Sequence, residues 1–242
     1  MKKSKFLSTH IRSLIFNIFL AVWTVFISTL LSPLIFFKNP KVMSALGISW
    51  SYGTIFALRV ICNIKIEVQG AHNLPSSPYI IACKHQSVLE TAFFQQYLKF
   101  PVYIIKKELL KIPFYGWFLK HMGMIPIDRE GGIYALKQML RDCEVNLKQN
   151  RSIVIFPEGT RVKPLESVKY HSGILAMKKK FPKTQIIPIA VNSGLFWPKN
   201  SWLKYSGTMI FKILPKLDEK LDNKNTLYEL KKIIDENSDA LL

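Results

Sequence analysis

The sequence predicts an α/β fold in which a twisted, mainly parallel sheet is flanked by helices and preceded by N-terminal, membrane-embedded helices. From residue 64 onward, short runs of β-branched residues alternate with segments of helical periodicity, which is the order of a helix-covered parallel sheet. Before that point, residues 13–37 contain no charged side chain, and a membrane-spanning helix needs about 20 apolar residues. We therefore divide the chain into a membrane-anchoring segment, residues 1–62, and an α/β domain, residues 63–242.

The N-terminal segment contains two apolar stretches. The second, Ile48–Cys62, carries only Arg59, and Pro33 near the end of the first is a place where the chain can turn back. Basic residues flank the first stretch on both sides, at positions 2, 3, 5 and 12 and at positions 38 and 41. One spanning helix, a re-entrant hairpin in one leaflet and a buried core helix all fit this pattern, and its length and lack of charge favour membrane embedding. We expect a hairpin whose flanks, near Lys3 and Lys41, lie on the same, cytosolic side.

Seven strands and five helices are expected in the α/β domain. The strands are short, rich in β-branched residues and bounded by Pro, Gly, Asn or Ser: Ile64–Val68, Tyr79–Cys83, Val102–Lys106, Met124–Ile127, Ile153–Phe156, Ile186–Val191 and Thr208–Ile213. The helices are Val88–Leu98, Glu108–His121, Ile133–Gln149, Gly173–Lys180 and Thr226–Asn237. Because functional loops of such folds lie at strand ends, the polar segments there are the first candidates for a site.

The charge balance predicts an anionic partner. Lys and Arg number 34 and Asp and Glu number 16, so the formal net charge is +18. Such an excess suits nucleic acid, anionic lipid or an acidic carrier, and does not choose among them. The three cysteines, at positions 62, 83 and 143, lie among apolar residues without metal-like spacing, so we expect buried thiols and no zinc site.

The first polar segment, Lys84-His85-Gln86-Ser87-Val88-Leu89-Glu90, follows the second predicted strand. His85 lies at the junction of strand and helix, and Glu90 lies on the first turns of the helix, where its carboxylate can point back toward the imidazole. A histidine that acts as a base must be held in one tautomer, and a carboxylate on its other ring nitrogen does this. A surface histidine near a helical glutamate would show the same pattern, so this pair does not decide the function by itself.

The second polar segment, Phe156-Pro157-Glu158-Gly159-Thr160-Arg161, closes the fifth predicted strand. Gly159 permits a turn with positive φ, Arg161 can bind a phosphate through its planar fork, and Thr160 can add a hydroxyl. Glu158 can hold Arg161 in place. An ordinary turn at a strand end remains the alternative.

Two further segments are weaker. Arg129, at the end of Gly123-Met124-Ile125-Pro126-Ile127-Asp128-Arg129, can reach a phosphate or be a solvated turn residue. The strand Ile187-Pro188-Ile189-Ala190 contains a proline, which predicts an edge or bulged strand that lines an apolar groove or simply belongs to the core.

In this order, the four segments resemble the motifs of the glycerolipid acyltransferase family, specifically 1-acylglycerol-3-phosphate acyltransferases. That family carries His-x4-Asp, a block with Gly and Arg, Phe-Pro-Glu-Gly-Thr-Arg, and a Val/Ile-Pro-Ile strand, and the resemblance spans residues 64–213. It implies transfer of a fatty acyl group from acyl-CoA or acyl-carrier protein to the sn-2 hydroxyl of lysophosphatidate, giving phosphatidate for phospholipid synthesis. It implies no cofactor and no metal, membrane lipid as a partner, and an active site facing the cytoplasm, at the inner membrane if the source is bacterial.

The resemblance also implies the residues of the site. His85 would be the general base and Glu90 would orient it. The substrate-binding residues would be Lys106, Arg129, Glu158, Gly159, Thr160 and Arg161, of which Lys106 and the two arginines would hold the acceptor phosphate. Position 90 is Glu where the family motif has Asp, and this departure bears on efficiency and subfamily more than on the reaction type.

Three rival interpretations stay open. An acyltransferase could use another lyso-lipid acceptor, such as a lysophospholipid or a lyso-aminolipid. Nucleic-acid binding is suggested only by charge, and the apolar N-terminus and the lack of a basic-aromatic module argue against it, so we expect no nucleic-acid partner. A non-catalytic lipid-binding protein is disfavoured because His85 and Arg161 are both present.

Overall fold

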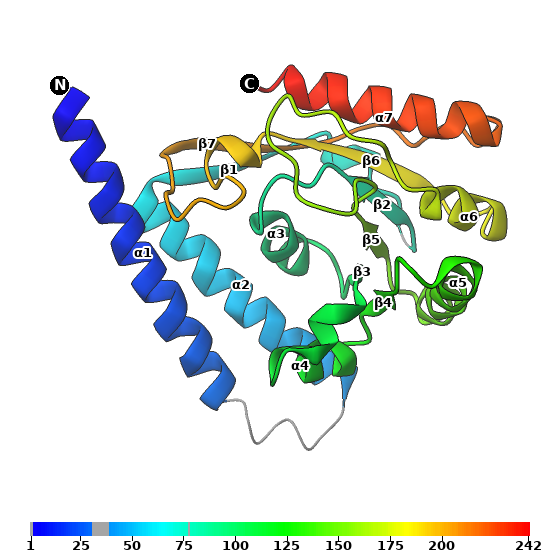
Figure 1. Cartoon of the computed structure of the whole chain (residues 1–242), viewed down its shortest axis with the longest axis horizontal. Coiled ribbons are helices and arrows are strands. Elements are labelled where there is room, and N and C mark those ends of the chain that lie inside the picture. The colour runs from blue at the N-terminus through cyan, green and yellow to red at the C-terminus, as the bar shows by residue number, and fades with distance from the viewer. Residues whose placement is uncertain (1, 31–38, 77) are drawn as a thin grey trace.

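The computed structural model describes residues 2–30, 39–76 and 78–242 and confirms the predicted α/β fold (Figure 1). Within these ranges one sheet of seven strands has the order β1-β7-β6-β2-β5-β3-β4. The strands are β1 (Ile64–Gln69), β2 (Ile80–Cys83), β3 (Val102–Lys106), β4 (Ile125–Ile127), β5 (Ile153–Ile155), β6 (Ile186–Val191) and β7 (Gly207–Ile213). Every neighbouring pair is parallel except β6 and β7. The carboxyl ends of β2, β5, β3 and β4 therefore meet at one edge.

The helices cover both faces of this sheet. They are α1 (Lys2–Leu30), α2 (Pro40–Cys62), α3 (Leu89–Tyr97), α4 (Tyr115–His121), α5 (Gly132–Lys148), α6 (Gly173–Lys180) and α7 (Asn223–Asp239), with short 3-10 helices η2 (Ala71–Asn73), η3 (Lys107–Lys111) and η4 (Ser193–Leu195). On one face α7 packs against β6, and on the other face α3 and α2 lie side by side (Figure 1).

The predicted helix Glu108–His121 is wrong in one respect, because it is two helices. Between η3 and α4 lies Pro113, which has no N–H to donate and whose ring disfavours a continuous helix. Phe114 follows with a left-handed φ of 61°. The chain resumes as α4 at Tyr115, where the Gly116 N–H donates to the carbonyl of Ile112 at 2.8 Å.

For the strand that contains Pro188, the edge interpretation is wrong and the alternative, that the strand belongs to the core, is correct. Strand β6 lies inside the sheet between β2 and β7, and all of its residues are buried. The antiparallel ladder to β7 begins only at Ile189 opposite Ile213, so the missing N–H of Pro188 falls just beyond it. The Pro188 carbonyl still accepts from the Leu214 N–H at 3.0 Å. The proline is therefore tolerated without exposing the strand.

The two N-terminal helices form an antiparallel pair (Figure 1). By length and composition, Phe6–Thr29 and Pro40–Cys62 are each able to cross a membrane. Only 11% of the first and 33% of the second is buried, which is not the pattern of core helices. The expected turn at Pro33 lies outside the described residues. Lys3 lies near the start of α1 and Lys41 near the start of α2, and because the two helices are antiparallel these starts lie at opposite ends of the pair. The expectation that both flanks face the cytosol stays a prediction.

The first helix is nevertheless tied to the α/β domain. The Ser13 hydroxyl accepts from the Lys204 N–H at 2.8 Å, and the Asn17 amide donates to the Trp202 carbonyl at 2.8 Å. The buried Lys204 ammonium donates to Asn17 Oδ1 at 3.0 Å and lies 4.5 Å from the ring centroid of Trp197. These contacts hold the N-terminal half of α1 against the segment before β7.

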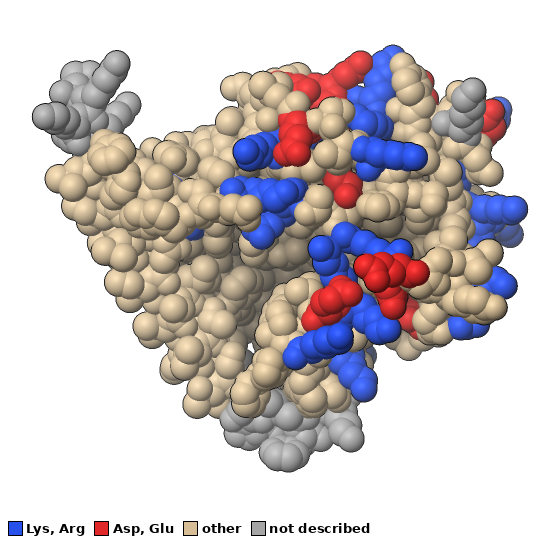
Figure 2. All heavy atoms as spheres, in the orientation of Figure 1, with Lys and Arg blue, Asp and Glu red and all other residues tan. Residues whose placement is uncertain are grey.

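Charged side chains are unevenly distributed between these parts. Figure 2 shows Lys, Arg, Asp and Glu gathered over the α/β domain, whereas the side formed by α1 and α2 is almost free of them on this face. Exposed apolar residues occupy the outer faces of these helices instead: Ile11, Leu14, Ile15, Ile18, Val22, Val25 and Phe26 on α1, and Phe56 and Val60 on α2. Exposed apolar surface is therefore concentrated on the two N-terminal helices and charge on the α/β part of the chain.

Candidate active site

His85 and Glu90 come together as predicted at the carboxyl end of β2. The imidazole Nδ1 lies 2.8 Å from Glu90 Oε2. Glu90 is fully buried, whereas 17% of the His85 side chain is exposed. With the Nδ1 proton donated to the carboxylate, Nε2 is left as the acceptor. This is the arrangement of an oriented general base.

The Glu90 carboxylate is held by donors on its other sides. The Ser87 N–H donates to Oε1 and Oε2 at 3.0 and 2.9 Å, and the Ser193 hydroxyl donates to Oε1. Ionised acceptors make strong hydrogen bonds with such donors. The carboxylate is therefore fixed between the turn after β2 and η4, which follows β6.

The turn that carries His85 packs against the segment after β5. The His85 ring stacks on Phe156 with ring centroids 3.9 Å apart. The backbone carbonyl of His85 accepts a hydrogen bond from the Val162 N–H at 2.7 Å. Gln86 Oε1 accepts from the Gly194 N–H at 3.0 Å. The strand order brings these distant segments together because β2 lies between β5 and β6.

Gly159 has a geometric reason to be glycine. Its φ is 67°, and a Cβ there would lie 2.8 Å from His171 Cδ2 and 3.2 Å from Arg129 Cζ. Arg129 donates to the Gly159 carbonyl. The turn is therefore tight, and it brings the guanidinium of Arg129 to the segment that carries Thr160 and Arg161.

A cavity of about 1130 Å³ opens beside this turn. Six predicted site residues line it: His85, Lys106, Arg129, Gly159, Thr160 and Arg161. Apolar side chains form much of the remaining wall and include Ile27 of α1 and Met43, Leu46 and Trp50 of α2. The base and the cations therefore share a space whose far wall belongs to the membrane-candidate helices.

Glu158 and Glu90 do not line this cavity. Burial raises the pKa of the Glu158 carboxyl to about 8, an effect that the nearby Lys84 opposes. Among the described residues no ion pair joins Glu158 to Arg161. Glu158 thus lies behind the turn, and the prediction that it holds Arg161 in place is wrong. Its part in shaping the loop stays a prediction.

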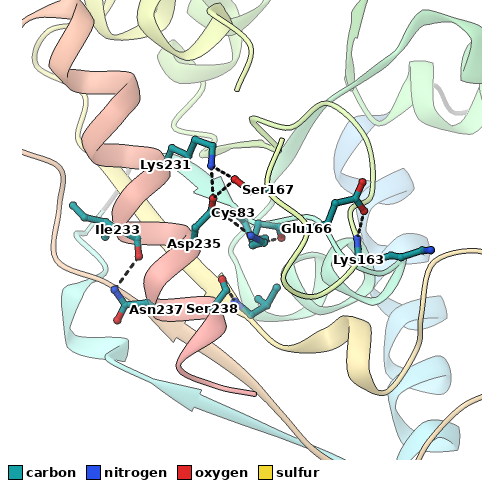
Figure 3. Close-up of polar contacts among 11 residues, drawn as sticks. Cys83, Lys163, Glu166, Ser167, Lys231, Ile233, Asp235, Asn237 and Ser238 are labelled. Atoms are coloured by element: carbon teal, nitrogen blue, oxygen red, sulfur yellow. Dashed lines mark hydrogen bonds and ion pairs between the residues drawn. The ribbon is translucent and has the colours of Figure 1, made fainter. Parts of the chain in front are cut away.

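An ionic network joins the turn that carries His85 to α7. Lys84, next to His85, pairs with Asp235 of α7 at 2.5 Å, and Lys231 pairs with the other oxygen of the same carboxylate at 2.5 Å. Figure 3 shows Lys231 and Ser167 meeting at Asp235. The C-terminal helix is therefore attached to the end of β2 that carries His85.

Three site residues escaped the sequence analysis. Ser193 contacts Glu90, and His171 and Ser172 line the cavity beside Gly159. Ser193 follows a predicted strand end, which is the one signal that the sequence offered for it. The three cysteines are free and buried, as predicted.

The acyltransferase family model matches residues 65–192 of the chain. The matched residues include His85, Glu90, Lys106, Arg129 and Arg161. The chain belongs to the acyltransferase family.

Relatives of this acyltransferase carry a more specific name. The chain is 36% identical over 184 residues to the 1-acyl-sn-glycerol-3-phosphate acyltransferase of Pseudomonas aeruginosa, across 75% of this chain and 70% of that protein. It is 35% identical over 184 residues to the enzyme of the same name from Helicobacter pylori, across 74% and 70%. The acyltransferase fold is shared with the crystal structure of PlsC, the 1-acyl-sn-glycerophosphate acyltransferase of Thermotoga maritima, with a TM-score of 0.77, 18% identity and coverage of 96% and 97%.

Proposed function

We propose that this acyltransferase moves a fatty acyl group from a thioester to the sn-2 hydroxyl of 1-acylglycerol-3-phosphate, giving phosphatidate. One observation carries the proposal: His85, which is paired with the buried Glu90, and three cationic side chains line the same cavity, and much of the remaining wall of that cavity is apolar. A base, a phosphate site and an apolar wall are what a phosphate-bearing lysolipid requires. The names of the bacterial relatives support the same acceptor.

In the proposed reaction His85 Nε2 accepts the proton of the acceptor hydroxyl as its oxygen attacks the thioester carbonyl. The carbon–sulfur bond then breaks, and the departing thiolate takes the proton back from the imidazolium. Glu90 stabilises the imidazolium by charge and keeps Nε2 turned toward the cavity. Direct passage of the acyl group agrees with the placement of the three cysteines, which are buried and do not line the cavity.

The acceptor phosphate would be held by Arg161, Arg129 and Lys106. Guanidinium groups bind phosphate oxygens in pairs, and an ammonium adds a point charge. Arg129 is already positioned by the Gly159 carbonyl. Thr160 would add a hydroxyl donor at the same end of the cavity.

The apolar wall would hold acyl chain and exclude water that competes for the thioester. The donor, acyl-CoA or acyl-carrier protein, is anionic in both cases, and the net charge of +18 favours its approach. No cofactor is needed for this chemistry. With both candidate spans in the membrane, the cavity would face the cytoplasm, where such donors are found.

The test is an acceptor panel with purified protein. Lysophosphatidate, neutral or zwitterionic lysophospholipids, a lyso-aminolipid and glycerol 3-phosphate are each offered with labelled acyl-CoA or acyl-carrier protein. We expect labelled phosphatidate from lysophosphatidate and release of one thiol per acyl group transferred. If only another lysolipid gives product, that lysolipid is the acceptor in place of lysophosphatidate. If no pair of donor and acceptor releases thiol, the enzyme assignment is contradicted.

A further inference from the structure

The tip of α4 exposes apolar side chains that the α/β domain does not cover. Phe114 is 78% exposed, and its neighbours Ile112 and Tyr115 are also exposed. The backbone fixes this projection: Phe114 has a φ of 61°, and a Cβ on Gly116 would lie 2.1 Å from the Leu110 carbonyl oxygen. A left-handed conformation is unfavourable for a bulky residue, and such conformations concentrate at functional positions.

A second exposed apolar pair lies at the start of α5. Tyr134 is 81% exposed and Ile133 is exposed beside it. Phe114, Tyr115 and Ile133 also line the cavity that holds His85. The two groups therefore border one opening, and we call Ile112, Phe114, Tyr115, Ile133 and Tyr134 together the rim patch.

The surroundings of the rim patch indicate what covers it. The same cavity is lined by Ile27 of α1 and Met43 of α2, so the patch continues the surface of the two helices long enough to cross a membrane. Figure 1 shows α4 beside the N-terminal end of α2. Exposed lysines accompany the patch at positions 106, 107, 111 and 120, against one acidic residue, Glu108, in the same stretch. Aromatic and aliphatic residues mixed with lysines are typical of surfaces that lie in the headgroup region of anionic membranes.

We propose that the rim patch is a second membrane-contact surface, inserted into the headgroup region of the bilayer that α1 and α2 enter. It would place the opening of the cavity at the lipid surface. This inference rests on the proposed function. With the opening at the lipid surface, a lysolipid can reach His85 without crossing water, because its acyl chain stays on apolar surface while its phosphate moves toward Arg129 and Arg161. The partner is the lipid surface itself.

The direct test uses one fluorescent label on the full chain in proteoliposomes containing an anionic phospholipid. Tyr134→Cys can be labelled selectively because the native cysteines are buried. Tyr228→Cys on α7 is the matched control, since Tyr228 is 63% exposed and does not line the cavity. We expect a lipid spin label placed near the headgroups to quench the probe at position 134 and not the probe at 228, and aqueous iodide to do the reverse.

Each other result overturns the proposal. Iodide quenching at both positions places the rim patch in water. Protection of position 134 from both quenchers shows that protein, such as a second copy of the chain, covers it. Because this readout needs no turnover, it stands or falls separately from the proposed acyl transfer.

A kinetic test follows with Ile112→Ser/Tyr134→Ser, since neither side chain lines the cavity. The apparent KM for lysophosphatidate in vesicles should rise on the order of tenfold, whereas turnover of a short-chain, water-soluble lysophosphatidate should be unchanged. The control Leu165→Ser/Tyr228→Ser removes comparable exposed surface elsewhere and should change neither. An equal loss with both acceptors would mean that the substitutions damage the fold, and no loss with vesicles would remove the rim patch from lipid entry.

Discussion

At the scale of single residues, the longer side chain at position 90 is accommodated by its contacts. Glu90 reaches His85 while accepting from the Ser87 N–H and the Ser193 hydroxyl. We predict that His85→Ala lowers kcat by about 10²–10⁴-fold. Glu90→Gln should be similarly harmful, because an amide cannot stabilise imidazolium by charge, and Glu90→Asp should be milder. The rate of radiolabelled phosphatidate formation by the folded variants measures these losses. Full activity of Glu90→Gln would contradict the proposal that Glu90 orients His85.

Ser193 provides a sharper test of positioning. We predict that Ser193→Ala lowers kcat about tenfold while both KM values stay unchanged, because the carboxylate loses a donor that a charged acceptor uses strongly. Ser87→Ala is the matched control: Ser87 is equally buried, but it serves Glu90 through its backbone N–H, which alanine keeps. Steady-state kinetics of both variants decide it. Equal losses in the two variants would point to general damage in the buried site.

Arg161 should act on acceptor binding. We predict that Arg161→Ala lowers kcat/KM for lysophosphatidate by the equivalent of ~1.5–3 kcal/mol, the usual worth of a hydrogen bond to a charged group. The KM for the acyl donor should not change. Arg141→Ala, which removes an exposed arginine of α5 that bonds Gln138, serves as the control. A raised donor KM instead would assign Arg161 to the phosphates of the donor.

At the scale of elements, sequence pattern predicted what depends on local chemistry. All seven strands were predicted correctly because their β-branched runs end at turn residues. The contact between His85 and Glu90 was predicted because both residues lie on one short strand-to-helix turn. The side chains that were missed depend on strand order. Ser193 reaches Glu90 only because β6 lies beside β2. The interior place of β6 likewise follows from strand order, which a single segment does not reveal. The break at Pro113 is different, because the proline itself was a local signal for it.

Glu158, in the loop after β5, should make the stability of the fold depend on pH. Burial raises the pKa of Glu158 from 4.5 to about 8. Between these values the unfolded chain ionises Glu158 and the folded chain does not, so its ionisation lowers the free energy of unfolding as pH rises. We predict that Glu158→Gln matches the wild type near pH 4.5 and exceeds it at pH 9 by on the order of a few kcal/mol. Chemical denaturation across this range measures it, with exposed Glu236→Gln as control; parallel curves for wild type and Glu158→Gln would contradict the assignment.

At the scale of the whole molecule, α1 belongs to both parts of the protein. Its N-terminal half is bound to the α/β domain through Asn17 and Lys204, while its outer face is apolar and exposed along its length. The base of the helix pair therefore stays with the domain, because α2 also ends there and leads into β1. If the two candidate spans enter a membrane, as proposed above, the bilayer would receive the outer faces and the far end of the pair, on the side where the cavity is lined by Ile27 and Met43.

This arrangement predicts how the protein leaves a membrane. Each lysine near anionic lipid contributes roughly 1 kcal/mol to membrane binding, and salt screens this attraction. The contribution from burying apolar helix surface in the bilayer is not screened by salt. We expect the protein to stay in the membrane pellet through high-salt washing and to leave only with detergent. Val22→Asn/Val25→Asn, which alters two exposed residues of the outer face of α1, should make salt extraction partly effective. Lys107→Gln/Lys111→Gln removes charge without apolar surface and should stay in the pellet. Release of the wild type by salt alone would mean that charge, rather than the apolar helix pair, holds this acyltransferase on the membrane.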